Sequence, residues 1–100
     1  MKEILNKLDK AFENKVRLGI MSALMVNDQM DFNSLKDLLG VTDGNLASHL
    51  KNLENKEYIG YEKDFVDRKP NTTYKATEAG KRAFKAHINA IENLLKLKRS

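Results

Sequence analysis

Apolar residues recur at steps of three and four positions through most of the chain, a period that predicts helices. The first amphipathic stripe, over residues 2–12, consists of Ile4, Leu5, Leu8 and Phe12. Asn14 can cap a second helix, whose broad apolar face predicts a place at the centre of the core. Residues 27–29 have turn composition, and residues 30–32 predict a very short strand.

Two short helices joined by a tight turn are predicted next. Asn33 or Ser34 can cap the first of them, and Gly40 can end it in a left-handed conformation. Thr42 can cap the second, over residues 42–56, and its inward-facing positions are Leu46, Leu50 and Leu53. Two short helices with so tight a connection are typical of a helix-turn-helix.

A β-hairpin is predicted over residues 58–76. Residues 59–65 alternate apolar with polar side chains, as a half-buried strand does, and residues 72–76 are rich in strand formers. Between them, residues 67–71 have turn composition and hold the only proline. Tyr74 is expected to pack in the core or within the hairpin.

A long last helix is predicted over residues 78–98, with Thr77 as its cap. Its apolar stripe consists of Phe84, Ile88, Ile91 and Leu95, flanked by Ala83, Ala90, Leu94 and Leu97. The terminal helices together offer more apolar surface than one small core needs, which predicts a homodimer. The candidate interface residues are Ile4, Leu5, Leu8, Phe84, Ile88, Ile91, Leu94 and Leu95. Packing of the two terminal helices on each other alone is the alternative.

Composition limits the classes of protein that this chain can be. One hundred residues predict a single domain over residues 1–100. There is no cysteine for a disulfide, a thiolate nucleophile or a thiolate metal site, and no run approaches the roughly 20 apolar residues of a membrane helix. We therefore expect a cytoplasmic protein with no membrane partner.

The sequence shows no pattern typical of a metal site or of a catalytic site. The only histidines, His49 and His87, lie on separate predicted helices, without carboxylates at ligand spacing. His87 lies on the apolar side of its helix, where a packed or interface histidine is expected. No glycine-rich phosphate loop or catalytic triad can be argued. The prediction is no metal, no cofactor and no enzyme activity.

The face of helix 42–56 opposite its leucines is the first candidate for contact with DNA. At 100° per residue, Gly44, Asn45, Ser48, Lys51, Asn52 and Asn55 point outward, with His49 on the flank. A face that only keeps a helix soluble usually carries glutamate and lysine, which are better helix formers than these residues. We expect the neutral groups to read base edges and Lys51 to approach a phosphate. An ordinary solvated face is the alternative.

The net charge of +4 does not by itself demand a polyanionic partner, because the surplus is concentrated near the end of the chain. Residues 78–100 carry six basic and two acidic side chains. At the turn of the predicted hairpin, Arg68 and Lys69 are candidate phosphate contacts, although Asp64 and Asp67 partly neutralise them. Asp43 interacts favourably with its helix dipole.

The order of these elements, and the residues themselves, resemble the MarR/ArsR-like winged-helix regulators, particularly the small single-domain members. The matching stretches are residues 17–24, 32–54 and 68–80. The most specific feature is the run at residues 48–53, paired with an Arg-x-Pro-x-Thr-x-Tyr wing that starts at Arg68. The resemblance spans most of the chain.

The resemblance implies a mostly α, α+β winged helix-turn-helix with a two- to three-stranded wing hairpin and an added C-terminal dimerisation helix. It also implies a homodimeric regulator, more readily a repressor, whose recognition helices enter successive major grooves of double-stranded DNA. The wings would then reach the backbone or the minor groove, and an unidentified small-molecule effector would use the dimer cleft. The candidate DNA contacts are Asn33, Ser34, Thr42, Gly44, Asn45, Ser48, His49, Lys51, Asn52, Arg68, Lys69, Asn71 and Thr72. A winged helix that binds protein instead of DNA is the alternative function.

Overall fold

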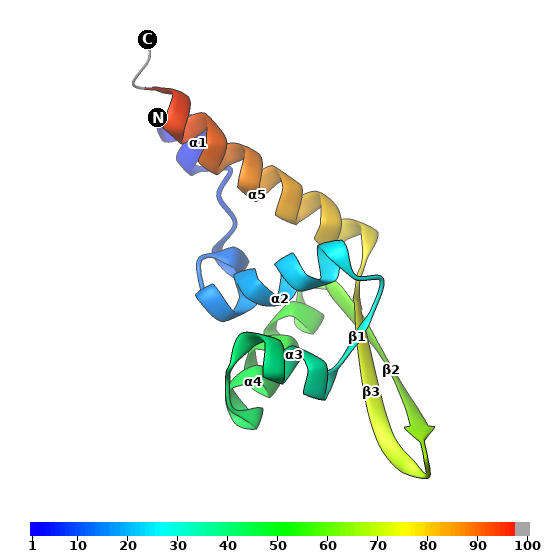
Figure 1. The fold of residues 1–100 in the computed structure, drawn as a ribbon. Helices are drawn as coiled ribbons and strands as arrows, with labels where there is room; N and C mark the ends of the chain where they lie inside the picture. Colours follow the sequence, from blue (N-terminus) through cyan, green and yellow to red (C-terminus); the bar gives the residue numbers. More distant parts are fainter. Residues whose placement is uncertain (98–100) are drawn as a thin grey trace.

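The computed structural model describes residues 1–97, which form helices around a small sheet (Figure 1). The helical elements are α1 (Lys2–Leu5), the 3-10 turn η1 (Lys10–Phe12), α2 (Lys15–Val26), α3 (Phe32–Leu39), α4 (Asp43–Asn55) and α5 (Glu78–Lys96). The strands are β1 (Met30–Asp31), β2 (Ile59–Val66) and β3 (Lys69–Ala76), in the antiparallel order β1-β3-β2. The predicted winged helix-turn-helix with a long last helix is confirmed. Residue 98, the predicted end of that helix, lies outside the described residues.

The core forms where α2 meets the helix-turn-helix and the base of the hairpin. Its fully buried side chains are Ile20, Met21, Leu35, Leu46, Leu50 and Leu53. The last three confirm the predicted inward face of α4. Full burial of one such side chain stabilises the fold by about 1.5–3 kcal/mol. This packing fixes which face of α4 remains in solvent.

Most of the predicted helix caps are confirmed. The side chains of Asn14, Thr42 and Thr77 accept backbone N–H groups at the starts of α2, α4 and α5. Gly40 ends α3 with φ at 65°, in the left-handed region. The predicted cap of α3 was wrong, because Asp31 caps this helix instead of Asn33 or Ser34.

The predicted first helix over residues 2–12 was also wrong, since α1 ends at Leu5 and η1 is a separate turn. Asp9 causes the interruption through contacts with distant parts of the chain. Its backbone N–H donates to His87 Nδ1 (2.9 Å), and its carboxylate accepts the Tyr58 hydroxyl (2.6 Å). The same carboxylate caps η1 at Ala11. His87 is thus a packed histidine, 4% exposed, with its ring against Phe12.

The hairpin differs from its prediction in its turn and in its burial. Asp67 and Arg68 alone form the turn, so residues 69–71 belong to β3. Pro70 is tolerated there because β1 pairs only with Thr73 and Tyr74, which leaves the distal part of β3 as a sheet edge. β2 is exposed from Tyr61 onward, whereas β3 is half-buried as far out as Asn71, and the tip projects away from the core (Figure 1).

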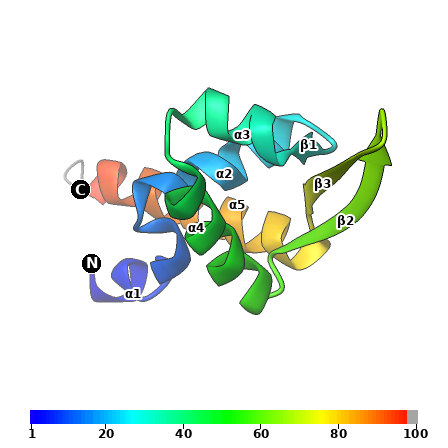
Figure 2. The same cartoon turned by 90° about the horizontal axis from the view of Figure 1, so that it is seen from below.

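The two ends of the molecule have different elements. The N-terminal helix α1 lies along the C-terminal half of α5 at one end, and α3, α4 and the hairpin occupy the other (Figure 1). Seen from that second end, α4 lies exposed with the hairpin to one side of it (Figure 2). The candidate DNA contacts are therefore gathered at one end.

Candidate nucleic-acid interface

The outer face of α4 presents short polar groups to solvent. Asn45, Ser48 and Lys51 are all exposed, as predicted from the leucine register. Thr42 Oγ1 accepts the Asn45 backbone N–H (3.2 Å), which fixes the first turn of the helix. Around Gly44 there is open space where a side chain would lie, so the backbone can approach a ligand closely there.

An ion pair offsets the negative charge at the start of α4. Lys36 Nζ of α3 lies 2.8 Å from Asp43 Oδ1. The hydrogen bond to this carboxylate, followed by its charge, raises the pKa of Lys36. Asp43 therefore presents less unpaired negative charge to a phosphate than its sequence position implies.

His49 lies on the flank of α4, half-buried against Arg17. Arg17 Nη1 lies 3.0 Å from His49 Nδ1, and Arg17 Nε donates to the carbonyl oxygen of Ala11 (2.7 Å). Because a guanidinium only donates, Nδ1 must accept and the ring proton belongs on Nε2. Burial, and then the charge of Arg17, lower the pKa of His49. His49 can thus serve as a neutral donor through Nε2; Arg17 was not singled out by sequence.

Asn52 was predicted to point outward, but its side chain is only partly exposed. It is half-buried, and its Oδ1 is buried and accepts no hydrogen bond within residues 1–97. A carbonyl oxygen shielded in this way cannot reach a base edge. The predicted contact by Asn52 would have to use its amide nitrogen.

The start of α3 is not an open anion site. Asn33 and Ser34 are exposed, but the Ser34 backbone N–H donates to Asp31 Oδ1 (2.8 Å). A phosphate there would meet the carboxylate that already caps the helix. The Ser34 N–H is therefore not free for a phosphate, and contact of Asn33 and Ser34 with DNA stays a prediction.

A groove of about 340 Å³ separates α4 from the hairpin. It is lined by Lys51, Glu54, Tyr61, Lys63, Thr72 and Tyr74. Lys63 was not among the predicted contacts, although strand alternation places it on the same side as Ile59 and Tyr61. Its Nζ lies 5.9 Å from the centre of the Tyr61 ring. Lysines from two elements thus flank one groove beside the polar face of α4.

The sequence matches a known protein family. The family model of the winged helix DNA-binding domain matches residues 16–95 of the chain. The chain belongs to this family. It is a DNA-binding family and not an enzyme family.

Similar proteins agree with the assignment to the winged-helix family. MJ0432, an uncharacterised protein of Methanocaldococcus jannaschii, is 38% identical over 87 residues, which cover 87% of this chain and 95% of that protein. The structure of a transcriptional regulator homologue from Pyrococcus horikoshii OT3 is 30% identical, with a TM-score of 0.84 over 95% of this chain and 92% of that one. A putative MarR-like regulator from Bacillus cereus shares the fold at 21% identity, with a TM-score of 0.70 over 95% and 70% of the two chains. The predicted winged-helix family is confirmed, and the likeness to the MarR-like regulator shows a shared fold.

The wing of this winged helix has two chemically different faces. Paired residues of an antiparallel ladder share a face, so Tyr61, Lys63, Thr72 and Tyr74 lie on the side of α4, which we call the groove face. Asn71 and Lys69 lie on the opposite, outer face, and Arg68 lies in the turn. Of the predicted wing contacts, only Thr72 is therefore brought next to α4.

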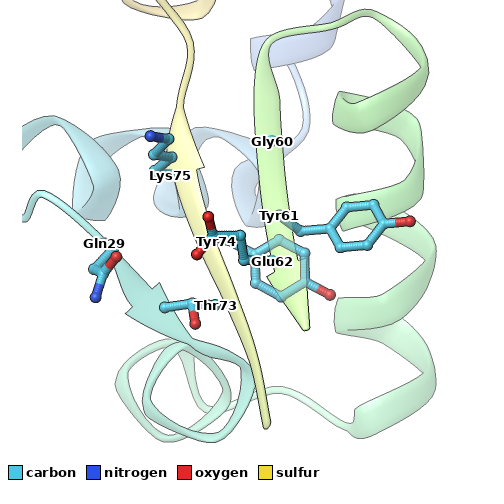
Figure 3. A pocket seen from close by; sticks show the side chains of 7 residues that line it. All are labelled: Gln29, Gly60, Tyr61, Glu62, Thr73, Tyr74 and Lys75. Carbon is cyan, nitrogen blue, oxygen red and sulfur yellow. The ribbon is translucent and has the colours of Figure 1, made fainter. Parts of the chain in front are cut away.

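A second, smaller pocket of about 170 Å³ lies at the base of the wing (Figure 3). In Figure 3 the Tyr61 side chain extends toward α4, whereas Thr73 and Lys75 lie toward Gln29, near β1. Tyr61 and Tyr74 line both this pocket and the groove beside α4, whereas Thr73 and Lys75 line this pocket alone.

Most of the apolar residues predicted for dimerisation lie on α1 and α5 of the winged helix, and Leu8 lies between α1 and η1. Leu5, Ile91 and Leu95 are 49%, 38% and 70% exposed, whereas Ile4, Leu8, Ile88 and Leu94 are half-buried. Phe84 is corrected: it is 8% exposed and its ring packs edge-on against Phe12 inside the same chain. Phe84 therefore belongs to the core and not to an interface.

Over residues 1–97, no group of three or more histidines or acidic residues could hold a metal ion. No helix within that range is long and apolar enough to cross a membrane.

Proposed function

We propose that this winged-helix domain is a sequence-specific, double-stranded DNA-binding transcriptional regulator. The observation that carries the proposal is the polar outer face of α4 beside a groove flanked by Lys51 and Lys63. A helix with short hydrogen-bonding side chains fits the major groove, where base pairs present distinct donors and acceptors. A wing beside it can reach the adjacent backbone or minor groove.

Specificity and attraction come from different residues in this proposal. Asn45, Ser48 and the Nε2–H of His49 read bases, because they are neutral and directional. Lys51, Lys63 and Arg68 contact phosphates, with Lys69 at the wing tip as a further cation. The remaining predicted contacts, Thr42, Gly44, Asn52, Asn71 and Thr72, surround these groups. The basic residues of α5, Lys81, Arg82 and Lys85, add attraction nearby; Lys98 and Arg99 lie outside the described residues.

A homodimer is the proposed functional unit. The exposed side chains of Leu5, Ile91 and Leu95 support it, because α1 and the C-terminal half of α5, which carry them, lie at the end of the molecule opposite the wing. We call these three residues the apolar strip. Two α4 helices would then occupy major grooves one helical turn apart, about 34 Å, on an inverted repeat. A dimer that covers promoter DNA in the cytoplasm would act as a repressor.

An unidentified small-molecule effector remains part of the proposal. A pocket of about 260 Å³, mostly apolar, lies between α2 and α5 and is lined by Met25, Phe84, Lys85, Ile88 and Asn89. A ligand in this pocket would contact the helix that carries the dimer strip. Occupancy could therefore change the separation of the two recognition helices.

Selection of bound sequences from random duplex DNA tests the proposal. The wild-type protein should enrich one motif at low salt, with affinity that falls steeply as salt rises. Ser48→Ala and Asn45→Ala should relax the motif at particular positions, whereas Arg68→Ala should weaken binding to all sequences and reduce the salt slope by about 1. If no motif is enriched at low salt, the regulator proposal is wrong.

The alternative is a winged helix that docks protein. The near-neutral outer face of α4, where Asp43 is paired with Lys36, favours it. Such a protein would show no sequence enrichment in the same selection.

A further inference from the structure

The distal wing exposes a large aromatic side chain whose surroundings point to DNA. Phe65 lies one residue before the end of β2, and its side chain is 71% exposed. It is paired with Pro70 across the hairpin, so two apolar groups lie side by side near the tip. Neither packs on the core, because the hairpin projects away from it (Figure 1).

Phe65 belongs to the groove face of the wing. The ladder runs without interruption from Ile59 and Ala76 to Val66 and Lys69, so residue parity decides the face. Phe65 therefore shares its side with Tyr61 and Lys63, which line the groove next to α4. The apolar tip continues the surface proposed to bind DNA.

Charge is divided between the two faces of the hairpin. On the groove face, Lys63 is the only charged residue of β2 and β3. Both acidic residues of β2, Glu62 and Asp64, lie on the outer face. The groove face of the hairpin is thus positive and free of carboxylates, which suits a polyanion, although the hairpin as a whole is close to neutral. Glu54 lines the groove from α4, opposite this face and beside Lys51.

The turn places further cations around the apolar tip. Asp67 and Arg68 have φ values of 51° and 66°, the left-handed pair of a tight two-residue hairpin turn. Arg68 and Lys69 therefore lie within a few residues of Phe65 at the end of the wing. Proteins that enter the minor groove insert an apolar side chain as a wedge between base steps. Cations beside such a side chain can hold the adjacent phosphates.

We propose that Phe65, backed by Pro70, is an apolar wedge that enters the minor groove of the bound duplex and partly unstacks one base step. This inference rests on the proposed DNA-binding function. In this proposal, the groove face of the wing contacts the same duplex whose major groove receives α4. The bound DNA should consequently be kinked under the wing, and flexible pyrimidine–purine steps should be preferred there, outside the bases that α4 reads.

The chain offers a matched control for this inference in Val66. Val66 is the next residue of β2, is 55% exposed and apolar, and faces the outer side. Phe65→Ala and Val66→Ala remove an exposed apolar side chain from the same strand, so both should fold like the wild type. Thermal unfolding of each variant checks this point.

The experiment uses the full chain and the duplex enriched by selection. Phe65→Ala should lower affinity by about tenfold or more, whereas Val66→Ala should change it by less than about twofold. With 2-aminopurine placed at successive steps under the wing, the wild type and Val66→Ala should raise fluorescence at one step by unstacking it. Phe65→Ala should abolish that rise, and energy transfer between the duplex ends should report a smaller bend.

The outcomes separate the wedge from the proposed function. If the wild type binds its motif but Phe65→Ala matches Val66→Ala in affinity and in 2-aminopurine signal, the wedge is wrong and the regulator function stands. If Phe65→Ala changes only the oligomeric state measured by light scattering, Phe65 serves a protein contact and the wedge is again wrong. If the wild type binds no duplex, both proposals fail.

Discussion

At the tip of the wing, one residue adopts a backbone conformation that folding alone does not favour. Arg68 has φ at 66°, a left-handed conformation that costs a non-glycine residue about 1 kcal/mol or more. Glycine is the residue that this turn position favours. A strained arginine at the tip of the wing is consistent with a role in binding.

Replacement of Arg68 by glycine should separate stability from binding. We expect Arg68→Gly to raise the free energy of unfolding by up to about 1 kcal/mol, because glycine accepts the positive φ without strain. DNA affinity should fall, with the salt slope reduced by about 1. Urea unfolding and salt titrations measure the two effects. Lys69→Gly is the control, since it removes the same charge from an extended residue and should not stabilise the fold. Equal changes of the unfolding free energy in the two variants would contradict the strain argument.

His49 should make the stability of the domain depend on pH. Its pKa is lowered in the folded state, first by burial and then by Arg17, so below the unfolded value of about 6.5 the unfolded chain binds more protons. Stability from this residue is therefore complete above about pH 6.5 and is lost as the pH falls through the lowered pKa.

The measurement compares urea unfolding of the wild type and His49→Gln between pH 5 and pH 8. His87 is present in both proteins, so the difference between them isolates His49. The advantage of the wild type should shrink as the pH is lowered. An unchanged difference over the whole range would show that Arg17 and burial do not disfavour the charged ring.

At the scale of elements, local patterns were sufficient where the contacts are local. The spacing of Leu46, Leu50 and Leu53 predicted the buried face of α4, and the caps Asn14, Thr42 and Thr77 act within three residues of themselves. The break after α1 could not be predicted in this way, because it depends on the contacts of Asp9 with Tyr58 and His87. These partners lie 49 and 78 residues away.

The same limit applies to the candidate site. The outward positions Asn45, Ser48 and Lys51 follow from helical periodicity alone. The pairing of Arg17 with His49 spans 32 residues, and the groove that includes Lys63 exists only once the hairpin packs beside α4. Strand register also depends on where the turn lies. The sequence predicted a turn over residues 67–71 because they include the proline, whereas Pro70 lies in β3.

The junction between α4, β2 and α5 is where one added carbon should matter most. A Cβ on Gly80 would collide with the carbonyl oxygen of Tyr58, which also accepts the Thr77 backbone N–H (3.0 Å). Gly80→Ala should therefore force the first turn of α5 away from the hairpin base and destabilise the fold by about 3 kcal/mol.

Gly44→Ala is the matched control for Gly80→Ala, because it makes the same substitution in a helix where nothing lies within 4 Å. It should stabilise by about 1 kcal/mol through helix propensity. Thermal and urea unfolding of both variants test the contrast. A tolerated alanine at Gly80 would show that the α5 contact can relax without cost.

At the scale of the whole molecule, the chain is elongated and chemically divided along its length. Its principal extents are 59 × 25 × 21 Å, with the wing at one end and α1 and the C-terminal half of α5, which carry exposed apolar side chains, at the other. A single recognition helix contacts too few base pairs for high affinity at physiological salt. Coupling two copies through the apolar end would leave both wings and both α4 helices free for DNA.

Disruption of the apolar strip should therefore weaken DNA binding without changing α4 or the wing. Leu95→Glu places a charge at the most exposed large apolar residue of α5, so we expect a monomer by light scattering and a fall of about a hundredfold or more in affinity for the inverted repeat. Affinity for an isolated half-site should change little, because each α4 and wing remain intact. Val26→Glu controls for the added negative charge, since Val26 is 83% exposed at the end of α2, away from the strip. If Leu95→Glu and Val26→Glu bind the repeat equally, the strip is covered by something other than a second copy of this chain.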